Sequence, residues 1–242
     1  MPTHTSKVYE HELRTLRDKL LLMGSLVEEM IHKGQAALST RDSGLAKATI
    51  RLDRRCNRLE CEVDELCMRI LATRQPVASD LRFVTAALKI VTDLERIGDL
   101  VVNICERVEE LNEESPLQVT EELTSLSEEA AAVVREALDA LVSRDVERAQ
   151  KLLSHDDHID DHYARIFQDV LALMSRDPST VYRATRVQSV AKYLERIADH
   201  AMNIAESVVF LVNGRDIRHY NRLKESDPLE VDHDVRPPQR SR

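Results

Sequence analysis

The sequence predicts an all-α protein, and three observations lead to that prediction. The chain of 242 residues contains only five Gly, no Trp and 3% aromatic residues. Strands favour aromatic and β-branched residues, and tight turns need Gly, so this composition favours helices. Apolar residues recur at intervals of three and four along most of the chain, as on the buried face of an amphipathic helix. In addition, part of the sequence repeats, which indicates two similar helical units.

The first three helices are delimited by caps and breakers. Apolar residues keep helical spacing from Leu13 to Ile31, and this pattern predicts a helix at about 8–40. Asp42 and Ser43 offer caps for a second helix at about 44–72. Pro76 then breaks the pattern, because proline cannot continue a helix. Ser79 or a neighbour can cap a third helix that reaches about residue 111.

Three further helices follow a stretch, NEESPLQ, that reads as the mid-chain boundary. After Pro116 a fourth helix is expected to end at about Val142. Asp145 opens a fifth helix, which ends at about residue 175, and Asp177 with Pro178 begins the sixth. Asn213 and Gly214 form a helix-stop pair. Beyond them we expect a polar, flexible tail.

An internal duplication relates the two halves of the chain. Residues 94–108 (LERIGDLVVNICERV) and 194–208 (LERIADHAMNIAESV) are identical at nine of fifteen positions. A second set of matching residues lies upstream, between Ala37 and Asp53, and recurs between Ala140 and Asp156. The connection before the last helix is shorter in the second half. Long helices joined by short loops pack antiparallel. We therefore expect two tandem antiparallel three-helix bundles, placed end to end. The boundaries predicted from the sequence are 1–113 for the first bundle, 114–213 for the second and 214–242 for the tail.

Composition excludes several classes of function. No Gly-rich phosphate-binding loop is present, and a net charge of −9 with few aromatic residues argues against nucleic-acid binding. No apolar run approaches the roughly 20 residues of a membrane span, and the polar N-terminus lacks the apolar core of a signal peptide. We therefore expect a cytoplasmic protein without direct membrane insertion. Its cysteines are expected to be reduced thiols that pack between helices, namely Cys56, Cys61, Cys67 and Cys105.

Paired carboxylates are the strongest chemical signal in the repeat. Glu95 and Asp99 are four residues apart, and so are Glu195 and Asp199. Four residues span about 6 Å along a helix and return to one face. Like charges at this spacing destabilise a helix unless something compensates. Lys192 lies three residues before Glu195, whereas Glu95 has no cation three or four residues away.

The middle helices supply a second set of oxygen side chains. Asp156 and Asp160 are also four residues apart, and their counterparts are Asp53 and Asn57. If the middle and last helices of each bundle face one another, the two sets come together. Clustered oxygen ligands suit Mg, Mn and Fe, and Zn tolerates them. The predicted metal ligands are Asp53, Asn57, Glu95, Asp99, Asp156, Asp160, Glu195 and Asp199. The alternative is that these charges form solvated helix faces or ion pairs between helices.

Enzymatic alternatives have weaker support. His158 and His162 have the spacing of a zinc-protease motif, but Ile159 occupies the position of its catalytic Glu. A ferritin-like di-iron enzyme needs ExxH pairs, and none accompanies Glu95 or Glu195. We found no nucleophile, cofactor loop or acid–base pair, so the sequence predicts a protein that acts by binding.

The repeated motifs resemble the PhoU family of phosphate-signalling regulators. The resemblance rests on RQPVASDLRFVTAALKIVTDLERIGDLVVNI, on YLERIADHAMNIAE and on STRDSGLAKATIRLD, and it covers about residues 6–213. It implies two three-helix bundles, a homodimer and no catalytic activity. It also implies iron or zinc clusters on the paired carboxylates. Because Asn57 replaces an aspartate in the first half, we expect that site to bind metal more weakly.

The resemblance further implies a negative regulator of phosphate uptake. Its expected partners are the cytoplasmic ATPase subunit of the phosphate ABC transporter and the sensor histidine kinase of the phosphate regulon. It would lie in the cytoplasm, peripherally associated with inner-membrane complexes. Two other hypotheses stay open, a metal-buffering protein that uses the paired carboxylates and a purely structural helical adaptor.

Overall fold

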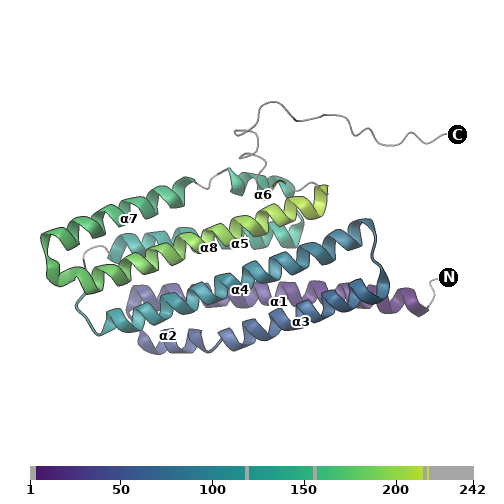
Figure 1. Cartoon of the computed structure of the whole chain (residues 1–242), viewed down its shortest axis with the longest axis horizontal. Helices are drawn as coiled ribbons and strands as arrows, with labels where there is room; N and C mark the ends of the chain where they lie inside the picture. The colour runs from purple at the N-terminus through teal and green to yellow at the C-terminus, as the bar shows by residue number, and fades with distance from the viewer. Residues whose placement is uncertain (1–3, 118–119, 155–156, 215–216, 218–242) are drawn as a thin grey trace, which may run out of the picture.

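The computed structural model describes residues 4–117, 120–154, 157–214 and 217, and within them it contains helices and no strand. The prediction of an all-α protein is therefore confirmed. The elements are α1 (His4–Thr40), α2 (Ser43–Ile50), α3 (Asp53–Arg74), α4 (Ala78–Asn112), α5 (Thr120–Ser143), α6 (Val146–Leu153), α7 (Asp157–Arg176), a 3₁₀ turn η1 (Pro178–Thr180) and α8 (Val181–Asn213). We refer to α1–α4 as repeat 1 and to α5–α8 as repeat 2 (Figure 1).

The middle helix of each repeat consists of two helices, so the single helices expected at 44–72 and 145–175 are wrong. In repeat 1 the break falls at Arg51 and Leu52. The Leu52 N–H donates to the Thr49 carbonyl at 2.9 Å, a bond three residues back instead of four, which tightens the chain for one turn. As a result, Asp53 begins α3.

The two repeats lie side by side along their length, and the end-to-end arrangement expected from the sequence is wrong (Figure 1). Helix α4 packs against α8, and α1 packs against α5. One apolar core therefore runs through both repeats and includes Ile97 of α4 and Ile197 of α8. Both α4 and α8 present apolar residues to their own repeat and to the other, and lateral contact buries both sets from water.

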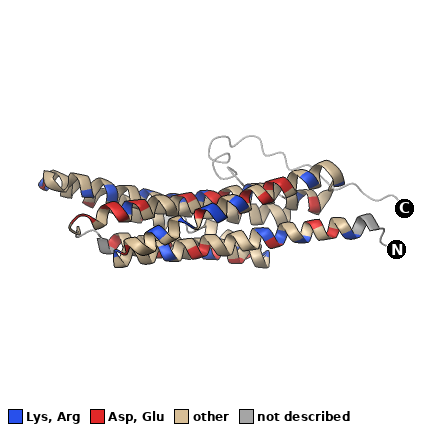
Figure 2. Cartoon of the chain, turned by 90° about the horizontal axis from the view of Figure 1, so that it is seen from below, with Lys and Arg blue, Asp and Glu red and all other residues tan. Residues whose placement is uncertain are grey.

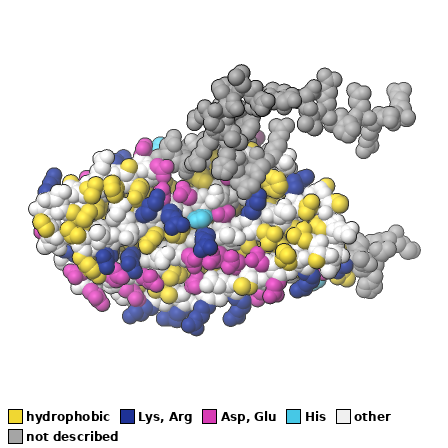
Figure 3. All heavy atoms as spheres, viewed as in Figure 1, with side chains coloured by type: hydrophobic (Ala, Val, Ile, Leu, Met, Phe, Trp, Pro, Cys, Tyr) yellow, Lys and Arg dark blue, Asp and Glu magenta, His cyan; other side chains and the backbone are white. Residues whose placement is uncertain are grey.

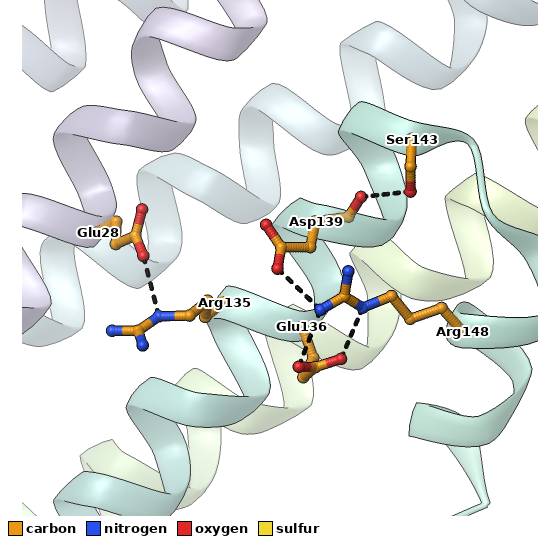
Figure 4. Close-up of polar contacts among 6 residues, drawn as sticks. All are labelled: Glu28, Arg135, Glu136, Asp139, Ser143 and Arg148. Atoms are coloured by element: carbon orange, nitrogen blue, oxygen red, sulfur yellow. Dashed lines mark hydrogen bonds and ion pairs between the residues drawn. The ribbon is translucent and has the colours of Figure 1, made fainter.

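Polar contacts also join the repeats. The Asp93 carboxylate on α4 lies 2.9 Å from His200 Nδ1 on α8 and accepts a hydrogen bond from Asn203 Nδ2 at 3.2 Å. On the other side, Arg135 of α5 lies 3.2 Å from Glu28 of α1 (Figure 4). Charged pairs between neighbouring helices fix their register in addition to the apolar packing.

Equivalent turns begin α2 and α6. Arg41 and Arg144 end the preceding helices with φ angles of 54° and 55°. The carboxylates of Asp42 and Asp145 then accept hydrogen bonds from Leu45 N and Arg148 N, as N-cap side chains do. The expected caps at both aspartates are confirmed.

In repeat 2 the turn carries an additional contact. Arg148 of α6 reaches back to α5, where its guanidinium lies 2.7 Å from Glu136 Oε2 and 2.8 Å from Asp139 Oδ2 (Figure 4). The equivalent residue in repeat 1 is Leu45, so this ion pair is peculiar to repeat 2.

Other helix ends agree only in part with the sequence prediction. Gly214 stops α8 with a φ of 71°, as expected. Ser79 does not cap the third long helix, because α4 begins at Ala78 and Val77 precedes it without a side-chain cap. The predicted tail, apart from Gly214 and Ile217, lies outside the described residues. Among the described helices, none is long and apolar enough to cross a membrane.

Candidate functional site

The first set of predicted ligands comes together between α3 and α4. Asp53 and Asn57 lie on the first turns of α3, and Asn57 Nδ2 donates a hydrogen bond to Asp53 Oδ2 at 3.0 Å. Burial, followed by the charge of Asp99 on α4, raises the pKa of Asp53, so Asp99 lies near this pair. Acidic side chains gather on this face, over α3 and α4 (Figure 3). We call this group, with Glu95 of α4, the repeat 1 seam.

Glu95 is the residue in this seam whose ionisation is most disfavoured. Its side chain is 14% exposed. Burial, followed by the negative charges of Asp99 and Glu60, raises its pKa to about 7. Burial and the charge of nearby Asp64 likewise raise the pKa of Glu60. Carboxylates that raise one another's pKa in this way leave an uncompensated negative field.

A buried thiol lies beneath the same seam. Cys56 of α3 packs against Gly98 of α4, where a Cβ atom would stand only 3.2 Å from the sulfur. Burial, followed by the charges of Asp53 and Glu95, raises the Cys56 pKa to about 12. The thiol therefore stays protonated and acts as a small apolar group.

Two buried oxygens of the repeat 1 seam lack a hydrogen-bond partner among the described residues. Asp53 Oδ1 and Glu95 Oε2 are buried and accept no hydrogen bond within the described part of the chain, although buried polar atoms are nearly always paired. Arg96 offers only long contacts, 3.5 Å to Glu95 Oε2 and 3.4 Å to Asp99 Oδ2, and its side chain is 55% exposed. These oxygens fit a cation in charge and in chemistry.

The side chains do not, however, form a finished coordination shell. Across the described ranges, no three His, Cys, Asp or Glu side chains are arranged to hold a metal ion. The repeat 1 seam is therefore a group of carboxylates with unmet charge, and metal binding there stays a prediction.

The second set of predicted ligands has a different environment. Lys192 Nζ lies 2.7 Å from Glu195 Oε1 on the same helix, while Glu195 Oε2 is buried without a hydrogen bond among the described residues. Asp160 and Asp199 are both exposed, and Asp156 lies outside the described residues. We call Asp160, Lys192, Glu195 and Asp199 the repeat 2 seam.

Lys192 is held in this seam by several groups. Burial opposes its charge, but the hydrogen bond and charge of Glu195, followed by the charges of Tyr163 and Asp199, raise its pKa overall. Its ammonium group lies 5.1 Å from the centre of the Tyr163 ring, within range of a cation–π interaction.

Two further acidic residues lie near the repeat 1 seam and were not predicted from the sequence. Glu60 adds negative charge near Glu95, and Asp64 adds negative charge near Glu60. Their counterparts in repeat 2 are Tyr163 and Phe167. A search for positions identical in both repeats cannot find them. The signal available was their spacing, since Asn57, Glu60 and Asp64 follow one face of α3 at intervals of three and four.

His162 and the buried cysteines pack between helices. His162 is buried, and its Nδ1 lies 3.1 Å from each carboxylate oxygen of Glu129 on α5. It therefore ties α7 to α5. The four cysteines are free thiols, as expected, but Cys61 is exposed and the prediction that it packs between helices is wrong.

Both the family model and the similar curated proteins that match this chain are of the PhoU type. The family model described as the PhoU domain matches the chain twice, at residues 20–108 and 123–208. A phosphate-specific transport system accessory protein PhoU homolog from Pseudomonas aeruginosa is 39% identical over 229 residues, which cover 94% of each chain. The phosphate-specific transport system accessory protein PhoU of Escherichia coli is 34% identical, over 89% of this chain and 90% of its own.

Solved structures show the same architecture. The crystal structure of PhoU from P. aeruginosa superposes with a TM-score of 0.82 at 39% identity, over 86% of this chain and 100% of the other. The phosphate transport system regulatory protein PhoU from Streptococcus pneumoniae gives a TM-score of 0.79 at 29% identity, over 86% of this chain and 98% of its own.

Proposed function

The chain belongs to the PhoU family, and on this basis we propose that it is a negative regulator of phosphate uptake and of phosphate-starvation signalling. The observation that carries the proposal is the double match to the PhoU domain, one in each repeat. The relatives that cover most of the chain are named as accessory proteins of phosphate-specific transport. A role in the regulation of phosphate transport follows from that kinship.

The proposed mode of action is contact with other proteins. The expected partners are the ATPase subunit of the phosphate ABC transporter and the sensor histidine kinase, engaged by a homodimer at the cytoplasmic side of the membrane. Basic and acidic side chains are interspersed along the helices of both repeats (Figure 2), and such surfaces give specificity and fast association with charged partners.

Metal binding at the repeat 1 seam is part of the proposal. Asp53, Glu95 and Asp99 would hold the ion, with Asn57 beside them. The support is that Asp53 Oδ1 and Glu95 Oε2 are buried and have no hydrogen-bond partner among the residues that the structure describes. A bound metal would supply positive charge to a seam that otherwise repels anions. The chain's own contribution is to place these oxygens on adjoining faces of α3 and α4.

A deletion strain tests the regulatory role. Without the protein, we expect phosphate-starvation genes to stay active in phosphate-rich medium, as read from a reporter fused to such a gene. The wild-type gene should restore repression. Normal repression in the deletion strain would refute the proposed function.

Substitution separates regulation from a purely structural role. Asp99→Ala and Asp199→Ala should each leave the protein folded, as judged by circular dichroism, and the reporter then shows whether either carboxylate matters for repression. If both variants lower the melting temperature but repress normally, the seams serve only to hold helices together.

A further inference from the structure

The junction of α2 and α3 carries a group of exposed arginines that the fold does not use. Four of the eight residues from 51 to 58 are arginine, and all four side chains are exposed. Within the described part of the chain, their guanidinium groups take part in no hydrogen bond or ion pair. Basic side chains line the lower edge of the molecule in Figure 3, along which α2 and α3 run in Figure 1. We call Arg51, Arg54, Arg55 and Arg58 the arginine patch.

The arginine patch does not stabilise the helix that carries most of it. Arg54 and Arg55 lie in the first turn of α3, which begins at Asp53, and the dipole of a helix disfavours positive charge at its N-terminal end. Arg54 and Arg58 are four residues apart on the same helix, a spacing at which like charges repel. Residues that break such local rules without a partner in the fold are expected at functional surfaces.

The carboxylates of α3 do not neutralise the arginine patch. Burial, followed by the charge of Asp99, raises the pKa of Asp53. Burial, followed by the charge of Asp64, raises the pKa of Glu60, and the cation that lowers it is Arg96 of α4. No arginine of the patch is among the described groups that shift these two carboxylates. The guanidinium groups therefore lie away from the repeat 1 seam.

Repeat 2 has the opposite charge at equivalent positions. The middle helices align with an offset of 103, so Arg54 and Arg58 correspond to Asp157 and Asp161. Asp161 is exposed, as Arg58 is. The duplicated helices do not need positive charge on this face, and the arginine patch is therefore particular to repeat 1.

We propose that the arginine patch is a docking surface for an acidic segment of a partner protein, whose carboxylates pair with the guanidinium groups. Arginine suits this task because its planar fork binds both oxygens of a carboxylate, whereas lysine offers a single point charge. Arg54 and Arg58 are about 6 Å apart along the helix axis, the rise that also separates two glutamates four residues apart on a partner helix. The inference extends the proposed function, from which it takes the mode of action by contact with other proteins.

An anionic membrane surface is the rival occupant, and two observations favour a protein. Helices that lie on a membrane place large apolar side chains beside basic ones. On α3, the large apolar side chain that is exposed is Met68, which follows Arg58 by almost three turns. The chain also has a net charge of −9, so an anionic surface repels most of the molecule.

Two synthetic helical peptides serve as probes, an acidic one with glutamate at every fourth position and a control with glutamine in its place. Binding of the full chain to each dye-labelled peptide is measured by fluorescence anisotropy at low salt. We expect only the acidic peptide to bind. Arg58→Glu should weaken its binding by about tenfold or more, the scale of a lost close charge pair. Arg58→Lys should weaken it less, because lysine keeps the charge.

The matched control is Arg165→Glu. Arg165 is exposed on α7, the equivalent middle helix of repeat 2, and its substitution changes the net charge by the same amount as Arg58→Glu. It should leave peptide binding at the wild-type level. Both side chains are exposed, so these variants are expected to fold, and circular dichroism verifies it. Sedimentation with vesicles of phosphatidylglycerol and phosphatidylcholine tests the rival occupant.

Three results would overturn the inference: no binding of the acidic peptide, equal losses in Arg58→Glu and Arg165→Glu, or a loss of vesicle binding in Arg58→Glu with peptide binding unchanged. The reporter assay judges the proposed function separately. If the deletion strain loses repression but Arg58→Glu keeps its peptide binding, the regulatory role stands and the docking surface falls. If Arg58→Glu loses peptide binding but the deletion strain represses normally, the reverse holds.

Discussion

The two repeats have equivalent long helices, but the environments of their equivalent glutamates, Glu95 and Glu195, carry opposite charge. In repeat 1, Glu95 is surrounded by other carboxylates, and its pKa rises to about 7. In repeat 2, Glu195 has Lys192 at 2.7 Å. Core positions tolerate little change after a duplication because close packing constrains them, whereas polar positions at a helix seam can diverge. Function that differs between the repeats is therefore to be sought at polar positions, in the seams and in the exposed arginine patch, and not in the core.

The largest expected effect tests whether the cores are equivalent. Ile97 and Ile197 are fully buried at matching positions. Ile97→Ala and Ile197→Ala should each lower the free energy of unfolding by about 3 kcal/mol, through lost apolar burial and the cavity left behind. Urea denaturation measures both. A loss several times larger in one variant would show that the shared core depends mainly on that repeat.

A smaller effect separates the two glutamates by pH. Burial and neighbouring carboxylates raise the pKa of Glu95 from 4.5 to about 7 in the folded chain. Between these two pH values, Glu95 is protonated in the folded state and ionised in the unfolded state. Glu95 therefore favours folding below about pH 4.5, and this contribution is lost as the pH rises to about 7. Glu95→Gln should raise the melting temperature at about pH 8 by about 2–4 °C, the shift for about 1 kcal/mol, and change little at about pH 4.5.

The matched control for that experiment is Glu195→Gln. It removes the partner of Lys192, so no stabilisation is expected at either pH. Equal stabilisation by both substitutions at high pH would mean that Lys192 does not neutralise Glu195, and the contrast between the seams would fail.

The smallest effect concerns an ion pair that repeat 2 alone possesses. Arg148 bridges Glu136 and Asp139 (Figure 4), but all three side chains are at least 36% exposed. Exposed pairs contribute about 0–1 kcal/mol. Arg148→Met should therefore leave the free energy of unfolding close to the wild-type value. A larger loss would show that surface charge, as well as the seams, distinguishes the stabilities of the repeats.

Much of the fold was predictable because helix ends follow local chemistry. Asp42, Asp145 and Gly214 end or begin helices through their own side chains or backbone freedom. The break at Arg51 and Leu52 was not predictable in this way, since neither residue disfavours a helix. Nor does periodicity tell how two bundles meet, because it identifies the apolar face of a helix and not the surface that will cover it.

The candidate site was predictable to the extent that the repeats are identical. Identity between the halves singled out Glu95 and Asp99, and in the structure Asp99 lies near Asp53, which accepts a hydrogen bond from Asn57. It could not reveal Glu60, Asp64 or the support that Tyr163 gives Lys192, because these residues differ between the repeats. Lys192 could be recognised from its spacing to Glu195, whereas the neighbours of each glutamate on the middle helices depend on how α3 packs against α4 and α7 against α8.

The central claim, that the repeat 1 seam has unmet negative charge while Lys192 supplies a cation to the other seam, is tested most directly by anomalous diffraction. Crystals of the wild-type chain grown with Mn²⁺, which carboxylate oxygens suit, should show an anomalous peak between α3 and α4, beside Asp53, Glu95 and Asp99. A peak beside Glu195 alone, or no peak between α3 and α4, would contradict the account.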